Sequence, residues 1–529
     1  MTVDHRRMAV KGMASLSLLL LCASSLLLTR GVAASRTWTV DQSGSADYRT
    51  IQQALDSAGD GDSIVVHSGT YYESVVVSKR VSIVGQDAVS TVIDGNGSAR
   101  VVTLSAGGIA LSGFTIRGGV EGVTVLSNMN NLTGNVLKSN FVGLVLGSGG
   151  EGNIVSENEI SMSATYGVYG DRCGKNLIAE NNVSSNGYDG IFLYQSEPCV
   201  LDNNRILSNV MDGARIRYSS NNTIEGNLFS GNDNGLVIYS DEDPLRKPGL
   251  AKYNTIEENI VVNNSRGIMI EHAAESAEMA ENVIRGNLIA FNGVGLNVSG
   301  SNGNLIFNND FVNNSKQVSL NDSLSNSWDG GYYVGGNYWS DYNGTDSHWG
   351  VDQNRTGSDG VVDLAYVVSV NPAENDTYPF ARADAWLEVP EIEMISPANG
   401  TYRQYHAQEI PLTLKMNKPL WVSYSLDGES NLTVTDSLDD LLVGVHGIML
   451  FANDTLGNEV SLGVSFTITF TEDLTLDGTV NIVDISIVAY SYGQSVGGQR
   501  WNPDADLNSD GTINILDIAM VAKEYGQKI

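Results

Sequence analysis

The chain has 529 residues, enough for several domains, and a formal net charge of −31 carried by aspartate and glutamate along its whole length. An acidic surface of this kind disfavours nucleic acid and anionic lipid as partners and suits a calcium-rich or salty exterior. We therefore expect no nucleic-acid partner.

The first segment has the features of a secretory signal peptide. Basic residues within 6–11 precede an apolar run over 16–28, and 32–34 read Val-Ala-Ala, a small-residue cleavage site. No later stretch approaches the roughly 20 apolar residues of a membrane span. The sequence thus predicts removal of 1–34 and an extracellular protein, secreted or associated with the cell surface, without membrane insertion.

A short amphipathic helix is expected near the start of the mature chain. Ile51, Ala54, Leu55 and Ala58 lie on one face of this helix, with Thr50 or Asp47 as its cap. Such a helix can cover the open first rung of a solenoid.

A repeat follows, from about Asn131 to Asn314. Each unit contains short strands with alternating apolar residues, separated by Asn and Gly that provide left-handed backbone at tight corners. The leading asparagines, each 23 positions apart, are Asn135, Asn158, Asn181, Asn204 and Asn227. A fixed period of this length predicts a solenoid, here a parallel β-helix with these asparagines stacked in a hydrogen-bonded ladder. An ordinary β-sandwich with coincidental spacing is the alternative.

Two features modify the repeat. Cys173 and Cys199 fall in successive coils near the same corner, so they are either a disulfide between rungs or a free buried pair. Insertions at 241–248 and 272–278 leave the same edge of the same sheet, and insertions on one face of a solenoid commonly build the walls of a binding site. Glu271, His272 and Glu275 form a candidate cluster there.

The outward positions of the repeat form a candidate sugar-binding strip. If the apolar alternating residues point into the core, the residues between them point out and stack from rung to rung. This outward set is Tyr169, Phe192, Tyr194, Arg215, Arg217, Tyr239, Met269 and Glu271. Aromatic faces stack on sugar rings and Arg binds carboxylates bidentately, which predicts Tyr169, Phe192, Tyr194, Tyr239 and Glu271 as substrate-binding residues. A partly solvated sheet face whose aromatics favour β-structure is the alternative.

The candidate catalytic residues are Asp189, Asp212, Arg215 and Arg217. Asp189 and Asp212 each precede the strand glycine in adjacent coils. Two carboxylates one rung apart can share protons in general acid/base hydrolysis, or hold calcium for a lyase that uses Arg215 or Arg217 as base. Asp-Gly is also a common tight turn, so a structural role stays open.

The end of the solenoid carries the sequence Gly336-Asn337-Tyr338-Trp339, followed by Asp359-Gly360 and Tyr378-Pro379-Phe380. Together with the amphipathic helix and Gly61-Asp62-Ser63-Ile64-Val65-Val66, these features resemble the pectate-lyase-like superfamily and, within it, the NosD-like family of exported β-helix proteins. The resemblance implies a right-handed parallel β-helix over 35–385 whose repeats are carbohydrate-binding and sugar-hydrolase modules.

Calcium and copper are the two metal ions to be considered for this part of the chain. Aspartates 346, 352, 359 and 363 of the closing segment can bind a further calcium ion. NosD-like proteins are associated with copper delivery to a reductase. However, the histidines after the predicted signal peptide are widely scattered and join no Cys/His/Met cluster with soft-ligand spacing, so we do not expect copper here; they are His67, His272, His348, His406 and His446.

Residues 386–470 change character. Short alternating strands at sandwich spacing, such as 420–426 and 464–470, resemble the immunoglobulin-like spacer domains of secreted microbial proteins. We find no chemistry in this stretch.

Residues 471–529 contain two calcium loops with oxygen side chains at positions 1, 3, 5, 9 and 12, Gly at position 6 and a main-chain carbonyl at position 7. The first loop consists of Asp473, Thr475, Asp477, Thr479, Asn481 and Asp484, and the second of Asp506, Asn508, Asp510, Thr512, Asn514 and Asp517. Because Thr475 is a weaker ligand than Asn508, the first site should bind calcium less tightly.

This duplicated loop–helix arrangement, with Asp at position 12, resembles a type I dockerin. The resemblance implies two calcium ions and a cohesin partner on a scaffold or surface protein, contacted through Ile482, Val483, Ile515 and Leu516. These four are apolar where many dockerins carry Ser or Thr, so the class of cohesin stays open. A purely structural calcium site at the C-terminus is the alternative.

The sequence as a whole predicts a secreted, mainly β protein that binds polysaccharide or surface glycan and is docked to a cohesin through calcium. If it is an enzyme, it is a glycoside hydrolase or a polysaccharide lyase. The alternatives are a non-catalytic cell-surface or adhesion protein and a copper-maturation accessory protein.

Overall fold

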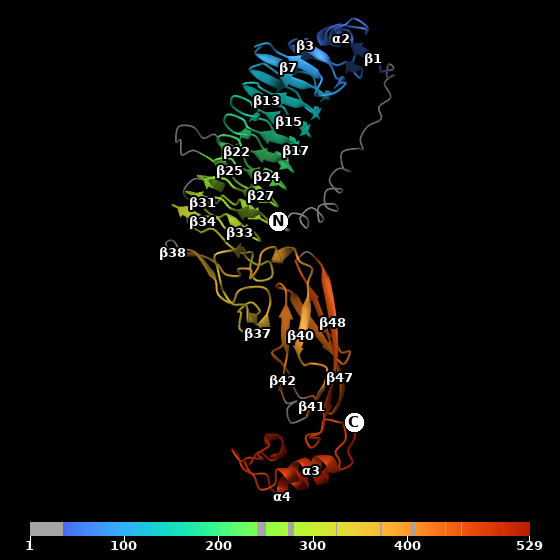
Figure 1. Cartoon of the computed structure of the whole chain (residues 1–529), viewed down its shortest axis with the longest axis vertical. Coiled ribbons are helices and arrows are strands. Elements are labelled where there is room, and N and C mark those ends of the chain that lie inside the picture. Colours follow the sequence, from blue (N-terminus) through green and yellow to red (C-terminus); the bar gives the residue numbers. More distant parts are fainter. Residues whose placement is uncertain are drawn as a thin grey trace.

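The computed structural model describes residues 35–240, 250–272, 280–323, 325–370, 373–403, 409–439, 441–455 and 457–529. The predicted signal peptide, most of the two insertions and His406 lie outside these residues. Figure 1 shows three successive parts: a long solenoid, a β-sandwich and a small helical unit at the C-terminal end. Within the described residues, no helix combines the length and apolarity needed to cross a bilayer.

The solenoid is built from three sheets of parallel strands, and each coil contributes one strand to each sheet in turn. The first twelve-stranded sheet contains β1 (Thr37–Val40), β2 (Ser63–Val66), β5 (Ser82–Gly85), β8 (Ala110–Ser112), β11 (Asn131–Thr133), β14 (Ile154–Ser156), β17 (Leu177–Ala179), β20 (Val200–Asp202), β23 (Thr223–Glu225), β26 (Thr255–Glu257), β29 (Val283–Arg285) and β32 (Leu305–Phe307). The second twelve-stranded sheet contains β3 (Gly69–Tyr72), β6 (Thr91–Asp94), β9 (Thr115–Arg117), β12 (Val136–Lys138), β15 (Glu159–Ser161), β18 (Asn182–Ser184), β21 (Arg205–Leu207), β24 (Leu228–Ser230), β27 (Ile260–Val262), β30 (Leu288–Ala290), β33 (Asp310–Val312) and β35 (Tyr338–Trp339). The eleven-stranded sheet contains β4 (Val75–Val77), β7 (Arg100–Leu104), β10 (Glu121–Val125), β13 (Val142–Leu146), β16 (Val168–Asp171), β19 (Ile191–Tyr194), β22 (Asp212–Arg217), β25 (Asn234–Tyr239), β28 (Arg266–Glu271), β31 (Val294–Ser299) and β34 (Lys316–Asn321). The predicted parallel β-helix is confirmed.

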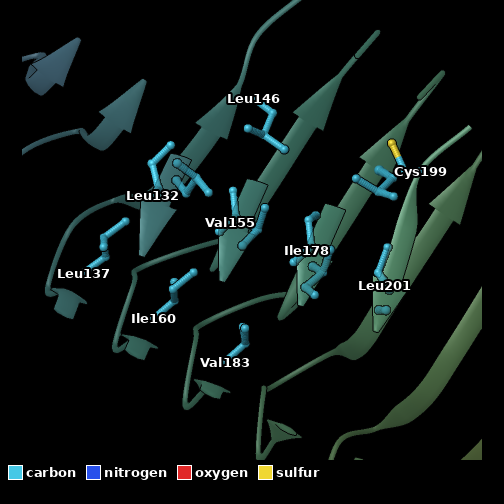
Figure 2. Packing of buried hydrophobic residues seen from close by; sticks show 14 of the residues in the cluster. Leu132, Leu137, Leu146, Val155, Ile160, Ile178, Val183, Cys199 and Leu201 are labelled. Carbon is cyan, nitrogen blue, oxygen red and sulfur yellow. The ribbon is translucent and has the colours of Figure 1, made fainter. Parts of the chain in front are cut away.

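The core of the solenoid consists of stacked columns of like side chains. Leu132, Val155, Ile178 and Leu201 occupy paired positions in successive strands and are fully buried, as Figure 2 shows. Every coil contributes such residues because the alternating pattern turns one side of each short strand inward. Burial of these columns is the main source of the solenoid's stability.

Buried asparagines stack along the corners. In the ladder from Asn135 to Asn227, each side-chain amide donates to the Oδ1 atom of the asparagine in the next coil at 2.9–3.1 Å. The predicted ladder is therefore confirmed, and further ladders run along other corners, for example from Asn186 to Asn209. Each amide provides both a donor and an acceptor, so the chain of hydrogen bonds continues without an unsatisfied member.

Both ends of the solenoid are closed. The predicted helix is α2 (Ile51–Ser57), with Thr50 as its N-cap and Ile51 and Leu55 buried against the first coil. At the other end, Asp376 accepts hydrogen bonds from the main-chain and side-chain amides of Asn337, the last rung of its ladder. A carboxylate is a suitable terminus, because a last asparagine has donors left over and an ionised carboxylate only accepts.

The closing segment is joined to the sandwich through a shared sheet. Its strands are β36 (His348–Trp349), β37 (Arg355–Ser358), β38 (Tyr366–Val370) and β39 (Ala373–Asp376), followed by the short helix η1 (Ala385–Leu387). The sandwich strands are β40 (Ile392–Ser396), β41 (Thr401–Arg403), β42 (Glu409–Pro411), β43 (Thr413–Met416), β44 (Trp421–Leu426), β45 (Leu432–Thr433), β46 (Ser437–Asp439), β47 (Gly444–Asn453) and β48 (Glu459–Thr469). Strand β37 pairs with β43, and Trp349 packs into the sandwich core.

The C-terminal unit contains α3 (Ile482–Tyr490), η2 (Pro503–Ala505) and α4 (Ile515–Lys523). Its small core includes Val480, Val488, Ile513 and Val521, all fully buried. Each predicted calcium loop leads directly into one of the two α-helices, so the expected loop–helix duplication is present.

Candidate functional site

The outward strip lies on the eleven-stranded sheet as two adjacent rows. One row runs through Tyr169, Phe192 and Arg215, which are paired in register on β16, β19 and β22. The other contains Tyr194, Arg217, Tyr239 and Glu271, each paired with the next. The structure thus brings the predicted substrate-binding residues together on one face, with Met269 in the first row after Val237. Phe192 is only 8% exposed, however, so the expectation that its ring is open to solvent is wrong.

Aromatic rings crowd one end of this strip. Tyr169 and Phe192 have centroids 5.5 Å apart, and Tyr166 packs on both, at 5.6 Å from Tyr169 and 5.4 Å from Phe192. Tyr188 meets Tyr166 edge-on at 6.0 Å. The sequence pattern missed Tyr166 and Tyr188 because both lie in turns before the strands. The only available signal was that Tyr166, like Asp189, directly precedes the strand glycine of its coil.

Arg217 lies among three tyrosines. Its guanidinium carbon is 6.0 Å from the ring centre of Tyr194, 5.0 Å from that of Tyr218 and 5.4 Å from that of Tyr239. Cation–π attraction acts over such distances and holds the side chain among the rings. Tyr218 is a further residue that alternation alone did not predict.

Asp189 and Asp212 share the guanidinium of Arg215. The Nε atom of Arg215 lies 2.6 Å from Oδ2 of Asp212 and 3.4 Å from Oδ2 of Asp189. Both carboxylates are fully buried, whereas the Arg215 side chain remains 26% exposed. Arg215 therefore lies between the two acids and the surface.

The charge states in this cluster follow from burial. Burial raises the pKa of Asp189 to about 7, with Arg215 opposing the shift and Asp212 adding to it. Burial acts to lower the pKa of Arg215, but the charges of Asp189 and Asp212 outweigh it, so the pKa of Arg215 is raised. Arg215 is thus held protonated, which disfavours a role as general base.

The acidic pair continues into a polar row along the sheet edge. Asn234 donates from Nδ2 to Oδ1 of Asp212 at 2.7 Å, and Arg266 donates to Oδ1 of Asn234 at 3.2 Å. The main-chain amide of Asp212 donates to Oδ1 of Asp189 at 3.1 Å. These contacts give both aspartates a structural role between coils. Asp212 and Gly213 lie inside strand β22, so they do not form the tight turn that the sequence offered as the alternative.

The two insertions begin beside each other. Strands β25 and β28 end at Tyr239 and Glu271, which are paired in register. His272 follows directly, whereas Glu275 lies outside the described residues. The proposed cluster of Glu271, His272 and Glu275 therefore stays a prediction.

Cys173 and Cys199 are free, buried thiols rather than a disulfide. The Sγ atom of Cys173 lies 3.4 Å from Oγ of Ser196. Cys199 occupies the place of an asparagine between Asn176 and Asn222, and its amide donates to Oδ1 of Asn222. Of the two alternatives from the sequence, the structure has the free pair.

The aspartates of the closing segment do not converge on a calcium site. Asp359 is buried and accepts from Tyr332 and Gln353, while Asp363 accepts from Ser347 and His348. In the described part of the β-helix and the closing segment, no group of three or more His, Cys, Asp or Glu side chains is arranged to hold a metal ion. The further calcium ion on the β-helix is thus unsupported, because these carboxylates serve internal hydrogen bonds.

The described histidines lie in separate parts of the chain. His67 lies in the first coil near Asp41, His348 is bonded to Asp363 in the closing segment, and His446 is bonded to Asp427 in the sandwich. His272, which is also described, directly follows β28. Copper binds preferentially where imidazole or sulfur ligands gather, and the expectation of no copper site stays a prediction.

The two C-terminal loops have nearly the same internal geometry. Asp484 accepts from the main-chain amide of Asn481 at 2.8 Å, and Asp517 accepts from Asn514 at the same distance. Each asparagine is the N-cap of the helix that follows its loop. The position-1 acids match as well, because Asp473 accepts from the amide five residues later in the chain, as does its counterpart in the second loop.

The residues of these loops fit calcium. Asp473, Asp484 and Asp517 are fully buried carboxylates at loop positions 1 and 12, where hard oxygen ligands are needed. Buried carboxylates of one charge are costly unless a cation balances them. The remaining predicted ligands, which include Thr475, Asn508 and the main-chain carbonyls at position 7, lie in the same loops.

The predicted partner-binding residues lie at the surface of this unit. Ile482, Val483, Ile515 and Leu516 are 63%, 49%, 61% and 58% exposed at the first turns of α3 and α4. Large apolar side chains gathered at equivalent places on two helices are typical of an interaction surface.

The chain matches two known families. Residues 55–245 and 249–344 match the family described as periplasmic copper-binding protein (NosD), and residues 471–525 match the dockerin type I domain. No curated protein matches the chain.

Three of the solved structures to which the chain is similar are an epimerase module, a lyase and a lacto-N-biosidase. The A-module of mannuronan C-5 epimerase AlgE4 from Azotobacter vinelandii is 16% identical over 52% of this chain and 94% of its own, with a TM-score of 0.39. An alginate lyase from Paenibacillus is 14% identical over 54% and 97%, with a TM-score of 0.32. A lacto-N-biosidase from Eubacterium ramulus is 12% identical over 55% and 67%, with a TM-score of 0.38.

The family matches agree with the solenoid and with the paired calcium loops. The NosD match ends where the solenoid is closed, and the dockerin match begins just after β48 ends at Thr469. Type I dockerins bind calcium and attach to cohesins, so both properties apply to the C-terminal unit. The chain belongs to the NosD family and carries a type I dockerin at its C-terminal end.

Proposed function

We propose that this protein binds polysaccharide or surface glycan along the outward strip of its β-helix while the dockerin holds it on a cohesin-bearing scaffold or surface partner. Its place is the extracellular space or the cell envelope, in keeping with the two families it matches. The observation that carries the proposal is the environment of Arg217, whose guanidinium lies among Tyr194, Tyr218 and Tyr239.

This part of the strip suits a sugar chain in both shape and chemistry. Tyrosine faces stack on the apolar faces of sugar rings, and guanidinium groups bind carboxylates or hydroxyls along the chain. Arg215 is fixed by Asp189 and Asp212, so little rotamer entropy is lost when it binds. Strand spacing places successive residues of each row about 4.8 Å apart, which gives an extended chain several contacts in sequence.

Binding is tested with the mature chain against a panel of neutral and uronic-acid polysaccharides. Arg217→Gln and Tyr194→Ala should each weaken binding about tenfold, as expected for the loss of one stacking or charged contact worth about 1.4 kcal/mol. Tyr72→Ala is the matched control, because Tyr72 is exposed on a strand of another sheet. Binding that responds equally to all three substitutions would contradict the proposed location.

A second candidate function is glycan hydrolysis at the buried acids. It is favoured by Asp189, whose raised pKa of about 7 leaves a proton available near neutral pH for a leaving group. Arg215 would have to swing away from both acids for a substrate to reach them, since it lies between them and the surface. The protonated state of Arg215 disfavours the lyase alternative with this residue as base.

Catalysis is separated from binding by Asp189→Asn and Asp212→Asn. Reducing ends and the absorbance of unsaturated products are followed over the same polysaccharide panel. A hydrolase releases reducing ends without the absorbance and loses turnover in both variants while glycan binding remains. Absorbance that depends on Arg217 indicates a lyase, and no product from any polysaccharide supports the non-catalytic adhesion protein.

The dockerin surface is tested through its four exposed apolar residues. Replacing Ile482 and Val483 by Ser in one half, or Ile515 and Leu516 by Ser in the other, should weaken binding to a cohesin. We expect the replacement of all four residues together to abolish cohesin binding. A copper-maturation role requires stoichiometric copper binding by the β-helix, and titration with copper checks that alternative.

A further inference from the structure

The sandwich and the dockerin are joined almost without a linker. Strand β48 ends at Thr469, and the first calcium loop begins at Asp473. Phe470, between them, packs against the dockerin core. The first calcium loop is therefore attached directly to the last strand of the sandwich.

A sandwich side chain contacts the first ligand of this loop. Thr469 is fully buried and donates from Oγ1 to Oδ2 of Asp473 at 2.6 Å. The same oxygen accepts from the amide of Gly478 at 2.8 Å. The other oxygen, Oδ1, faces the loop interior, where it accepts from Thr475 and from the amide of Asp477. Thr469 thus fixes one oxygen of the Asp473 carboxylate together with Gly478, while the other oxygen contacts Thr475 and Asp477.

The second loop has no such support. Asp506 accepts hydrogen bonds from the main-chain amides of Asp510 and Gly511, and within the described residues no side chain donates to it. The residue equivalent to Thr469 in the duplication is Asn502, which instead accepts from the amide of Asp504 to begin η2. The hydrogen bond from the sandwich is therefore specific to the first loop.

The sandwich also holds both halves of the dockerin through one buried arginine. Arg403, at the end of β41, donates from Nε to the carbonyl of Thr471 at 2.7 Å and from Nη1 to the carbonyl of Asp504 at 3.1 Å. These two carbonyls occupy equivalent positions, each two residues before the first ligand of its loop. Arg403 thereby fixes the first loop beside Thr469.

We propose that the sandwich completes the first calcium site, with Thr469 as the residue that positions the Asp473 carboxylate. The first loop carries the weaker ligand Thr475 where the second has Asn508. Hydrogen bonds that orient a metal ligand typically change metal affinity about 10-fold to 100-fold. The support from Thr469 offsets the weaker ligand, so the sandwich sets calcium affinity in one half of the dockerin.

The test measures calcium binding by calorimetry in the full chain, one loop at a time. Asp510→Ala leaves only the first loop intact, and Asp477→Ala leaves only the second. In the first background, Thr469→Val should weaken calcium binding about 10-fold, whereas Thr469→Ser keeps the hydroxyl and should stay within about twofold of Thr. In the second background, Thr469→Val should have no effect.

The control substitution is Thr467→Val, two residues earlier on the same strand, where Thr467 pairs with Thr401 and Val445 of the sandwich. Calcium affinity of the first loop should be unchanged there. The proposal is overturned if Thr469→Val binds calcium at the first loop as tightly as Thr469. It is also overturned if Thr469→Ser weakens binding as much as Thr469→Val, or if both loops weaken equally.

Discussion

The β-helix and the dockerin both arise from repetition, but the repeats preserve different residues. In the dockerin, the loop ligands are repeated, and Asp484 and Asp517 each accept a hydrogen bond from the amide of the asparagine three residues earlier. In the β-helix, the inward residues and corner asparagines are repeated, while one outward row changes from Tyr169 to Phe192 to Arg215. Calcium binding can therefore be predicted from the repeat itself in the dockerin, whereas the site proposed for the solenoid lies where the repeat varies.

The largest expected difference between the two regions is their response to calcium removal. A chelator should abolish cohesin binding, because the loop carboxylates such as Asp473 and Asp517 are buried and need the cation. The thermal unfolding of the β-helix should not change. Binding and unfolding are followed in the same samples with calcium restored as the control. A calcium-dependent shift of the β-helix transition would contradict this comparison.

The next largest expected effect is the loss of stability caused by a substitution in the core of the solenoid. Ile178→Ala removes a fully buried side chain from a stacked column and should lower the free energy of unfolding by about 3 kcal/mol. Ile154→Ala is the matched control, because Ile154 is exposed on the neighbouring strand, and it should cost less than about 0.5 kcal/mol. Urea unfolding measures both. Equal losses would mean that the inward columns do not dominate stability.

Breaking one rung of the asparagine ladder should have a somewhat smaller effect. Asn181→Ala leaves the amide of Asn158 without its acceptor and the carbonyls of Val155 and Ala179 without their donor. Unsatisfied buried groups of this kind should cost about 2 kcal/mol in total. The adjacent Asn182 is exposed, so Asn182→Ala should leave the urea midpoint nearly unchanged. If Asn181→Ala leaves the free energy of unfolding unchanged, the ladder does not contribute to the stability of the solenoid.

A pH dependence is expected from Asp189, which is fully buried beside Arg215. The pKa of Asp189 is raised from 3.8 to about 7, so the folded state holds the proton more tightly than the unfolded state. Its contribution to stability is present below about pH 4 and is lost as the pH rises through about 7. Asp189→Asn should therefore flatten the pH profile, by up to about 1.4 kcal/mol per pH unit across this window.

Thermal unfolding of both proteins between pH 5 and pH 8 measures the effect. Asp376 and Asp359 are also buried acids with raised pKa values of about 7 and about 6, so the wild-type profile retains some slope in the variant. The informative quantity is the difference between the two profiles. Parallel profiles would mean that Asp189 is already ionised in the folded protein.

The sequence predicted those features that recur along the chain. The ladder through Asn135, the buried columns and both calcium loops all follow from spacing, because each coil or half repeats the same local chemistry. It did not predict Tyr166, which lies in a turn and packs on Tyr169 of the same coil, or Tyr218, which lies in a turn and packs on Tyr194 of the preceding coil. Asp376 was missed for a similar reason, since its partner Asn337 is 39 positions away.

The candidate catalytic residues could likewise be predicted only in part. Spacing placed Asp189 and Asp212 one coil apart, as the structure has them, but it could not show that Arg215 lies over both. That contact depends on side-chain rotamers and on how deeply the two acids are buried. Neither can be read from a pattern of apolar residues. The ion pair holds the Arg215 side chain in place and restricts access to Asp189 and Asp212.

The most direct test of the central claim combines both regions in one measurement. The mature protein is captured on an immobilised cohesin in calcium, and polysaccharides that bind it in solution are passed over the surface. The account predicts that the surface retains polysaccharide with wild-type protein and with Tyr72→Ala, that Arg217→Gln retains markedly less, and that a chelator releases protein and polysaccharide together. Retention that is unchanged in Arg217→Gln, or capture that persists without calcium, would contradict it.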